Sequence, residues 1–143
     1  MKRRIHVLTL GVDDLDRSVA FYRALGFESE GIIGTEFEPS DTVPGGAAAM
    51  FQLDGGLILS LYERVNLAKD GNVPQGPRSS GEFSIGHLVA SRDDVDAVLA
   101  EAEAAGATRT DPPHERPWGI YSAYFRDPDG HLWEIIWNPA MTP

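Results

Sequence analysis

The 143-residue sequence predicts an α+β fold built from two copies of one module, in which a strand and a helix precede three strands. The stretch VLTLGVDDLDRSVAFYRALG, residues 7–26, aligns without a gap to HLVASRDDVDAVLAEAEAAG, residues 87–106. Apolar residues in both stretches recur at helical spacing after a short strand-like run. Each copy is followed by β-rich runs joined by glycine-containing turns, which are typical of hairpins. Two similar modules are expected to enclose a space between them.

Module one begins with a strand at residues 5–10, which are rich in Val, Leu, Ile and Thr. Asp13 and Asp14 are expected to open the following helix, because a short acidic side chain accepts hydrogen bonds from free backbone N–H groups. Gly26 is expected to end that helix in the left-handed conformation. Three further strands are expected at residues 27–33, 47–53 and 57–62, the last two joined by Asp54-Gly55-Gly56.

Residues 64–81 form the longest irregular stretch, with three glycines and two prolines. We expect a linker or lid over residues 64–82, between module one (residues 1–63) and module two (residues 83–143) of a single domain. Module two repeats the order of elements. Its elements are expected at residues 83–90 (strand), 93–105 (helix), 108–117 (turn-like), 120–126 and 132–137 (strands joined by DPDG).

Composition excludes several classes of function. The formal net charge is −10, with a pI near 4.7, so nucleic-acid binding, which normally needs a basic face, is not expected. No apolar run reaches 18 residues, so no membrane span is expected. The absence of cysteine excludes disulfides and fits a cytoplasmic protein. Acidity is typical of a solvated surface and also favours encounter with cationic ligands.

The order of elements, together with VDDLDRSVAFYRALGF near the start and DPDGHLWEIIWNP near the end, resembles the vicinal oxygen chelate superfamily. This superfamily includes glyoxalase I, extradiol dioxygenases, fosfomycin-resistance thiol transferases and bleomycin-resistance proteins. The resemblance implies two βαβββ modules whose mixed sheet forms a cup, often completed by a homodimer. It implies no single reaction, because members divide into metal enzymes and metal-free binding proteins.

The resemblance also implies where metal ligands would lie. His87 matches the histidine of the first strand of module two, and Glu134 matches the glutamate of the last strand. In module one the corresponding positions fall on Val7 and on Ser60 or Leu59, none of which is a normal ligand of a divalent metal.

His6 is a weak substitute for Val7, because successive strand residues point to opposite faces unless a bulge shifts the register. A catalytic divalent site normally has at least three protein ligands. The expected cofactor is therefore either none or a divalent metal such as Zn, Ni, Mn or Fe in an incomplete site.

Glu134 and His87 are the candidate catalytic residues. Glu134 stands within the apolar segment LWEIIW, and a buried carboxylate needs a partner. That partner can be a metal, His87, a ligand amine or a structural arginine such as Arg126. If both faced the cup, the pair could transfer protons without a metal. The alternative for His87 is a core histidine bonded to a backbone carbonyl.

Aromatic residues are frequent in the last quarter of the chain, and core packing explains most of them. Small-molecule pockets are also lined by aromatic residues with a few polar groups. The candidate ligand-binding residues are Phe51, Gln52, Trp118, Tyr121 and Trp133.

Three functions remain open. The first is a metal-free protein, similar to the bleomycin-resistance branch, that binds a small apolar or cationic molecule with Glu134 as charged anchor. The second is a divalent-metal lyase or isomerase, dioxygenase or thiol transferase that uses His87 and Glu134. The third is an interaction module that uses the fold only as a scaffold.

Overall fold

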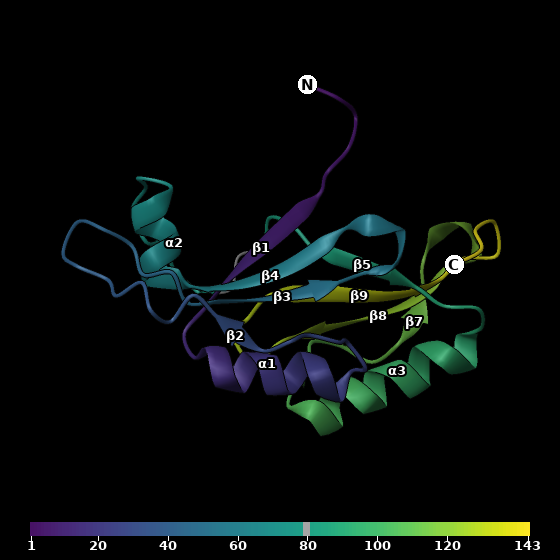
Figure 1. The fold of residues 1–143 in the computed structure, drawn as a ribbon. Coiled ribbons are helices and arrows are strands. Elements are labelled where there is room, and N and C mark those ends of the chain that lie inside the picture. The colour runs from purple at the N-terminus through teal and green to yellow at the C-terminus, as the bar shows by residue number, and fades with distance from the viewer. Residues whose placement is uncertain (79–80) are drawn as a thin grey trace. The chain divides into compact units, whose positions relative to one another are not determined.

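The computed structural model describes residues 1–78 and 81–143. The chain divides into two compact units, Met1–Pro77 and Arg78–Pro143 (Figure 1). Each unit is a small mixed sheet with a helix against one face, which confirms the predicted α+β class. No helix within these described residues is long and apolar enough to cross a membrane.

Unit 1 is a four-stranded sheet in the order β1-β4-β3-β2. Strand β1 runs parallel to β4, and the other neighbours are antiparallel. The short helical turn η1 replaces the expected tight hairpin loop between β3 and β4. The elements are β1 (Val7–Val12), α1 (Leu15–Ala24), β2 (Ile32–Ile33), β3 (Ala48–Gln52), η1 (Asp54–Gly56), β4 (Ile58–Glu63) and α2 (Arg64–Asp70).

Helix α1 begins and ends where the sequence predicts. The carboxylate of Asp14 caps it by accepting a hydrogen bond from the backbone N–H of Arg17 at 3.0 Å. Beyond its end, Gly26 has a φ of +89°, a conformation that glycine adopts without steric cost. Its apolar stripe is buried against the sheet, and Tyr22 is fully buried beside the ring of Phe51.

Two expectations for unit 1 were wrong. Residues 64–70 form helix α2 rather than an irregular linker, and the buried Asn66 fastens that helix to its surroundings. The Asn66 side-chain oxygen accepts a hydrogen bond from Gly45 N at 2.9 Å, and its amide nitrogen donates to Glu63 at 2.6 Å. The glycines and prolines that suggested a loop all follow this helix. Residues 79 and 80 of the predicted linker lie outside the described residues, and only two residues of the expected strand 27–33 pair in a sheet.

Unit 2 is a five-stranded sheet in the order β5-β9-β8-β6, with β7 also paired to β8. Strand β5 is parallel to β9, and the remaining pairs are antiparallel. The stretch expected to be turn-like contains two short strands. The elements are β5 (Ile85–Leu88), α3 (Arg92–Ala105), β6 (Thr108–Arg109), β7 (His114–Glu115), η2 (Pro117–Gly119), β8 (Tyr121–Arg126) and β9 (Leu132–Trp137).

Helix α3 starts one residue earlier than predicted, and its cap is Ser91 instead of an aspartate. The Ser91 hydroxyl accepts from the backbone N–H of Asp94 at 3.1 Å and donates to the Asp94 carboxylate at 2.7 Å. Asp93 and Asp94 occupy the first turn, where negative charge suits the positive end of the helix dipole. Gly106 ends the helix with a φ of +115°.

The sheet of unit 2 has two chemically different faces, because side chains alternate along each strand. On the helix-covered face, buried apolar residues of β8 and β9 pack with α3: Ala123, Phe125, Trp133 and Ile135. On the opposite face, β8 and β9 carry Ser122, Tyr124 and Glu134. We call this second face the helix-free face, since no helix of unit 2 within the described residues packs on it.

Candidate ligand-binding site

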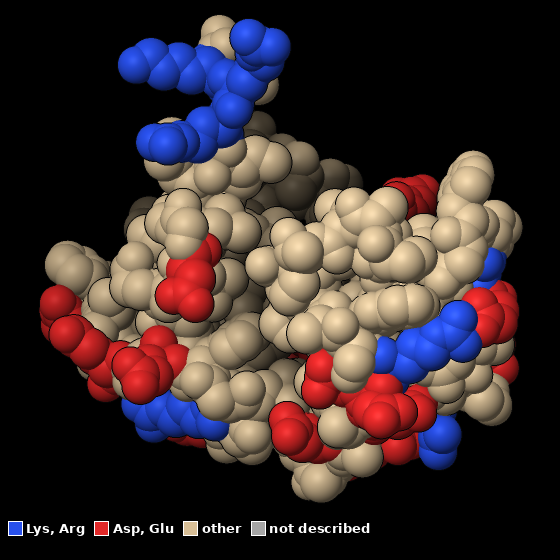
Figure 2. Space-filling model, turned by 90° about the vertical axis from the view of Figure 1, so that its right-hand side faces the viewer, with Lys and Arg blue, Asp and Glu red and all other residues tan. Residues whose placement is uncertain are grey.

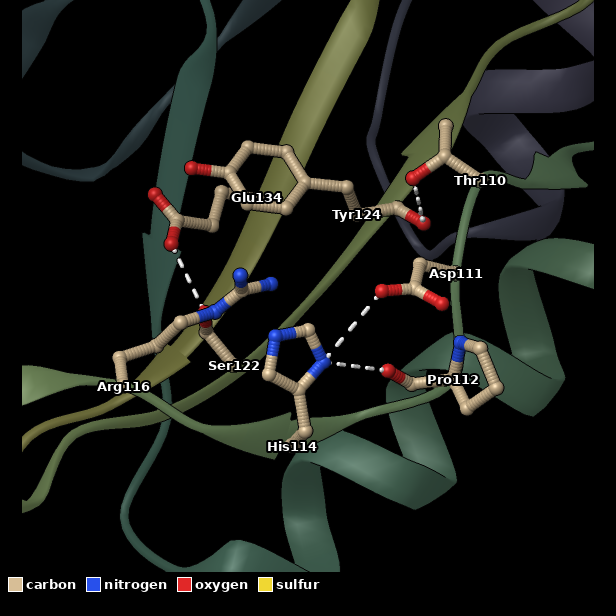
Figure 3. Close-up of polar contacts among 8 residues, drawn as sticks. All are labelled: Thr110, Asp111, Pro112, His114, Arg116, Ser122, Tyr124 and Glu134. Atoms are coloured by element: carbon tan, nitrogen blue, oxygen red, sulfur yellow. Dashed lines mark hydrogen bonds and ion pairs between the residues drawn. The ribbon is translucent and has the colours of Figure 1, made fainter.

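A connected group of polar side chains surrounds Glu134 on the helix-free face of unit 2 (Figure 3). The hydroxyl of Ser122 donates a hydrogen bond to the Glu134 carboxylate at 2.9 Å. The same hydroxyl accepts one from the Arg116 Nε at 3.1 Å. Ser122 is fully buried, whereas Arg116 and Glu134 are half-buried. A single hydroxyl therefore joins a cation to an anion without direct contact between them.

Tyr124 is the fourth member of this group, which we call the Glu134 cluster. It lies directly across from Glu134 in the β8–β9 register, so the two side chains leave the same face of the sheet. Burial raises the pKa of Tyr124, and the neighbouring Glu134 carboxylate raises it further. The Arg116 guanidinium, 5.4 Å from the ring centre, opposes this rise in pKa. Tyr124 therefore keeps its proton beside the carboxylate.

Arg126 was the example of one of four kinds of partner that the sequence left open for Glu134, but its side chain bonds elsewhere. Arg126 donates instead to the backbone oxygen of Gly130 at 2.7 Å. Arg116 is the arginine that reaches the cluster. It follows β7 directly, and its backbone N–H donates to Ile120 O at 2.7 Å across the β7–β8 hairpin. The hairpin thus places the Arg116 side chain over the sheet.

Cation–π and ionic contacts of Arg92, at the start of α3, link that helix to the β7–β8 hairpin. The Arg92 guanidinium lies 5.3 Å from the ring centre of Tyr121 and 4.9 Å from that of Trp137. Arg92 also forms an ion pair with Glu115, next to Arg116 in the chain. The Tyr121 hydroxyl donates to Asp96 at 3.2 Å. Tyr121, a predicted ligand-binding residue, therefore has a structural role at the helix-covered side.

The structure does not bring His87 and Glu134 together. Glu134 is paired with Gly86 in the β5–β9 register, and the exposed His87 is paired with Ile135. Because paired residues share a face and successive residues alternate, the two side chains leave opposite faces of the sheet. His87 is not a buried core histidine either, so the alternative offered for it also disagrees with the structure.

The register difference between the repeats explains this outcome. In unit 1, Val7 pairs with Ile58. The corresponding pair in unit 2 would be His87 with Leu132, but His87 lies three residues further along β9. A shift by an odd number of residues exchanges the two faces of a strand.

The side chains present do not fit a divalent-metal centre. Within residues 1–78 and 81–143, no group of three His, Cys, Asp or Glu side chains is placed to hold an ion. On the corresponding face of unit 1, Ser60 occupies the place of Glu134, opposite Met50, and Val7 offers no donor atom. His6 is exposed and precedes β1. Three ligands are the usual minimum for a catalytic site.

Two of the candidate lining residues lie in the cores. Phe51 is completely buried beside Tyr22 and Phe27. Trp133 is 6% exposed and stacks on Phe125, with ring centres 6.2 Å apart. Strand alternation places both side chains on the helix-covered faces. There they are packed in the core and are not accessible to a ligand.

The remaining two lining candidates are exposed. Trp118 is 89% exposed at the tip of the β7–β8 hairpin, with a φ of +63°. Gln52 lines an open groove of about 550 Å³ in unit 1, together with Met50, Ile33 and the carboxylate-bearing loop 28–31.

Sequence reasoning missed Arg116, Ser122 and Tyr124 as site residues. A signal for two of them was available in YSAYFR, where Ser122 and Tyr124 alternate with the apolar Ala123 and Phe125. Arg116 had no such signal, because its contact depends on the fold of the β7–β8 hairpin.

Comparison with known proteins is consistent with this fold. Residues 4–135 match the family model "Glyoxalase/Bleomycin resistance protein/Dioxygenase superfamily". The chain is 28% identical over 133 residues to metallothiol transferase FosB from Lysinibacillus sphaericus, covering 92% of this chain and 79% of that protein.

Among solved structures, a glyoxalase-related enzyme from Fulvimarina pelagi has a TM-score of 0.78 at 29% identity, with 96% of this chain and 90% of that chain covered. Lactoylglutathione lyase from Agrobacterium tumefaciens has a TM-score of 0.64 at 26% identity, with 96% and 95% covered. The predicted resemblance is thereby confirmed. The chain belongs to the glyoxalase/bleomycin resistance protein/dioxygenase superfamily.

Proposed function

We propose that this protein binds a small organic cation with an apolar body, and that Glu134 anchors the cationic group without a metal ion. One observation carries the proposal: the half-buried Glu134 carboxylate accepts a hydrogen bond from the buried Ser122 hydroxyl and lies beside Tyr124, and no cation among the described residues pairs with it directly. A fixed carboxylate with remaining acceptor capacity is suited to an ammonium group.

The chemistry of the carboxylate supports this role. An ionised carboxylate offers about four acceptor positions, and Ser122 uses one of them. A hydrogen bond between charged partners is about twice as strong as one between neutral partners. On the face drawn in Figure 2, most acidic side chains lie in the lower half, with some basic side chains among them and a further basic group at the top. The net charge of −10 favours the approach of cations.

A metal-dependent transferase or lyase is the second candidate, and the likeness to a metallothiol transferase and to a lactoylglutathione lyase favours it. That function needs a third ligand and needs His87 on the same face as Glu134. Neither condition agrees with the donor set described above.

Calorimetric titration separates the two functions. After dialysis against a chelator, we expect phenethylamine to bind, with about tenfold weaker binding in Glu134→Gln, equivalent to about 1.4 kcal/mol. Glu101→Gln, an exposed substitution on α3 with the same change of charge, is the matched control and should bind like the parent. Micromolar binding of Zn²⁺, Ni²⁺, Mn²⁺ or Fe²⁺ that is lost in both His87→Ala and Glu134→Gln would overturn the proposal.

A further inference from the structure

We infer that the ligand carries an oxyanion beside its cationic group, and that Arg116 binds this oxyanion. The inference rests on the proposed function, because it places the second charged group of the ligand next to the one held by Glu134. It assigns Arg116 to ligand binding and narrows the ligand class to zwitterions with neighbouring charges.

The guanidinium of Arg116 is fixed on one edge and available on the other. Its Nε donates to Ser122 at 3.1 Å, and its plane lies over the ring of Tyr124. Its two terminal nitrogens have no hydrogen-bond partner within the part of the chain that the structure describes. Arginine presents its donors as a planar fork that matches carboxylate and phosphate oxygens in a bidentate manner. The edge left over here is suited to such an oxyanion.

Glu134 does not satisfy this arginine, although it lies near. Ser122 stands between them, accepting from the guanidinium and donating to the carboxylate. Two other arginines of unit 2 pair directly with carboxylates: Arg92 with Glu115, and Arg109 with Glu103 at 3.1 Å. The fully buried Ser122 therefore keeps the two charges apart and leaves each available to a ligand.

The spacing of the two charges defines the ligand chemistry. An anion site and a cation site separated by one hydroxyl suit a molecule whose oxyanion and ammonium group are attached to the same or adjacent carbons. An α-amino carboxylate and an α-amino phosphonate share this chemistry. The positive charge of Arg116 stabilises a desolvated oxyanion of the ligand, whereas the negative charge of Glu134 alone would repel it.

Three related probes test the inference by calorimetry: phenylalanine with both groups, phenethylamine with the ammonium alone, and hydrocinnamate with the carboxylate alone. We expect phenylalanine to bind at least about tenfold more tightly than either single-group probe. Arg116→Gln should reduce phenylalanine to the affinity of phenethylamine and leave phenethylamine within about twofold. Arg109→Gln is the matched control, because it removes an arginine of the same unit that lies outside the cluster.

Two further measurements refine the test. The phosphonate analogue of phenylalanine tells whether the site prefers a carboxylate or a phosphonate. If Arg116→Gln loses the far-ultraviolet circular dichroism of the parent, Arg116→Lys replaces it. Lysine keeps the charge but lacks the planar fork, so the preference for phenylalanine should be reduced rather than abolished.

The inference is overturned if phenethylamine binds through Glu134 while phenylalanine binds no better and Arg116→Gln has no effect; the proposed function then stands. Arg116-dependent binding of hydrocinnamate without any binding of phenethylamine overturns the proposed function and supports the oxyanion site. No binding by any probe overturns both.

Discussion

Removing the hydroxyl of Ser122 should destabilise the protein and collapse the Glu134 cluster. Ser122→Ala deletes two hydrogen bonds at once, to Arg116 at 3.1 Å and to Glu134 at 2.9 Å. A hydrogen bond to a charged group contributes about 1.5–3 kcal/mol. Both charged partners are half-buried, so water and direct pairing recover part of the loss. We therefore expect a net loss of about 1.5–2 kcal/mol in the free energy of unfolding, near the lower end of that range for one bond.

Urea denaturation followed by circular dichroism measures this change, and Ser60→Ala is the control. Ser60 is 5% exposed on a strand of unit 1, and the described residues give it no charged partner, so its loss should cost less. A double-mutant cycle with Arg116→Gln adds a direct test, because residues that share a hydrogen-bond network show coupling of about 0.5–3 kcal/mol. A loss below about 0.5 kcal/mol, or additivity within the error of the cycle, would refute the reasoning.

Three further predictions concern strain, ionisation and register. Trp118→Gly should raise the free energy of unfolding, measured by urea denaturation, by about 0.5 kcal/mol. Relief of the left-handed conformation gains about 1–2 kcal/mol, which exceeds the cost of about 0.4–1 kcal/mol for the more flexible unfolded chain. Trp118→Ala keeps the strained conformation and should not stabilise the protein. Because the pKa of Tyr124 is raised in the folded state, its contribution to stability is complete below pH about 10 and is lost as pH rises through the folded-state pKa. Ultraviolet titration should show a pKa above that of free tyrosine. Glu134→Gln should lower this pKa, and an unchanged titration would contradict the assignment. Nuclear Overhauser contacts across β5–β9 should join His87 to Ile135, and contacts from His87 to Leu132 instead would disprove the register.

The repeated pattern in residues 7–26 and 87–106 was sufficient to predict helices α1 and α3, their glycine ends and the strands that precede them. These features depend on local spacing and on alternation, which a sequence displays directly. The pairing of His87 was not predictable in the same way. Strand register is set by contacts between distant segments, and a shift of three residues leaves every local pattern unchanged while it exchanges the faces.

The role of Glu134 was partly predictable. A carboxylate inside LWEIIW had to have a polar partner, and the structure supplies Ser122 and Tyr124. Arg116 could not be assigned, because its side chain reaches the cluster through the β7–β8 hairpin and the Arg92 contacts with that hairpin. Helix α2 was missed for a simpler reason: the turn-forming residues after it dominated the interpretation of the whole stretch.

The two faces of each sheet have different freedom to change. On the helix-covered faces, Ala49 and Phe51 of unit 1 occupy the same register positions as Ala123 and Phe125 of unit 2, and all four are almost completely buried. On the other faces, the residues that correspond to Ser122, Tyr124 and Glu134 are Ala48, Met50 and Ser60. The second set includes no large apolar residue of the helix-covered cores, although Ser60 and Ser122 are themselves buried.

This separation makes the fold a practical starting point for design. The triple change Ala48→Ser, Met50→Tyr and Ser60→Glu would transplant most of the Glu134 cluster into unit 1 while leaving the large apolar residues of its core untouched. The three substitutions are best made together, because a glutamate at the buried position 60 without hydroxyl donors would be costly. One scaffold could in this way carry a second, independently tunable recognition surface.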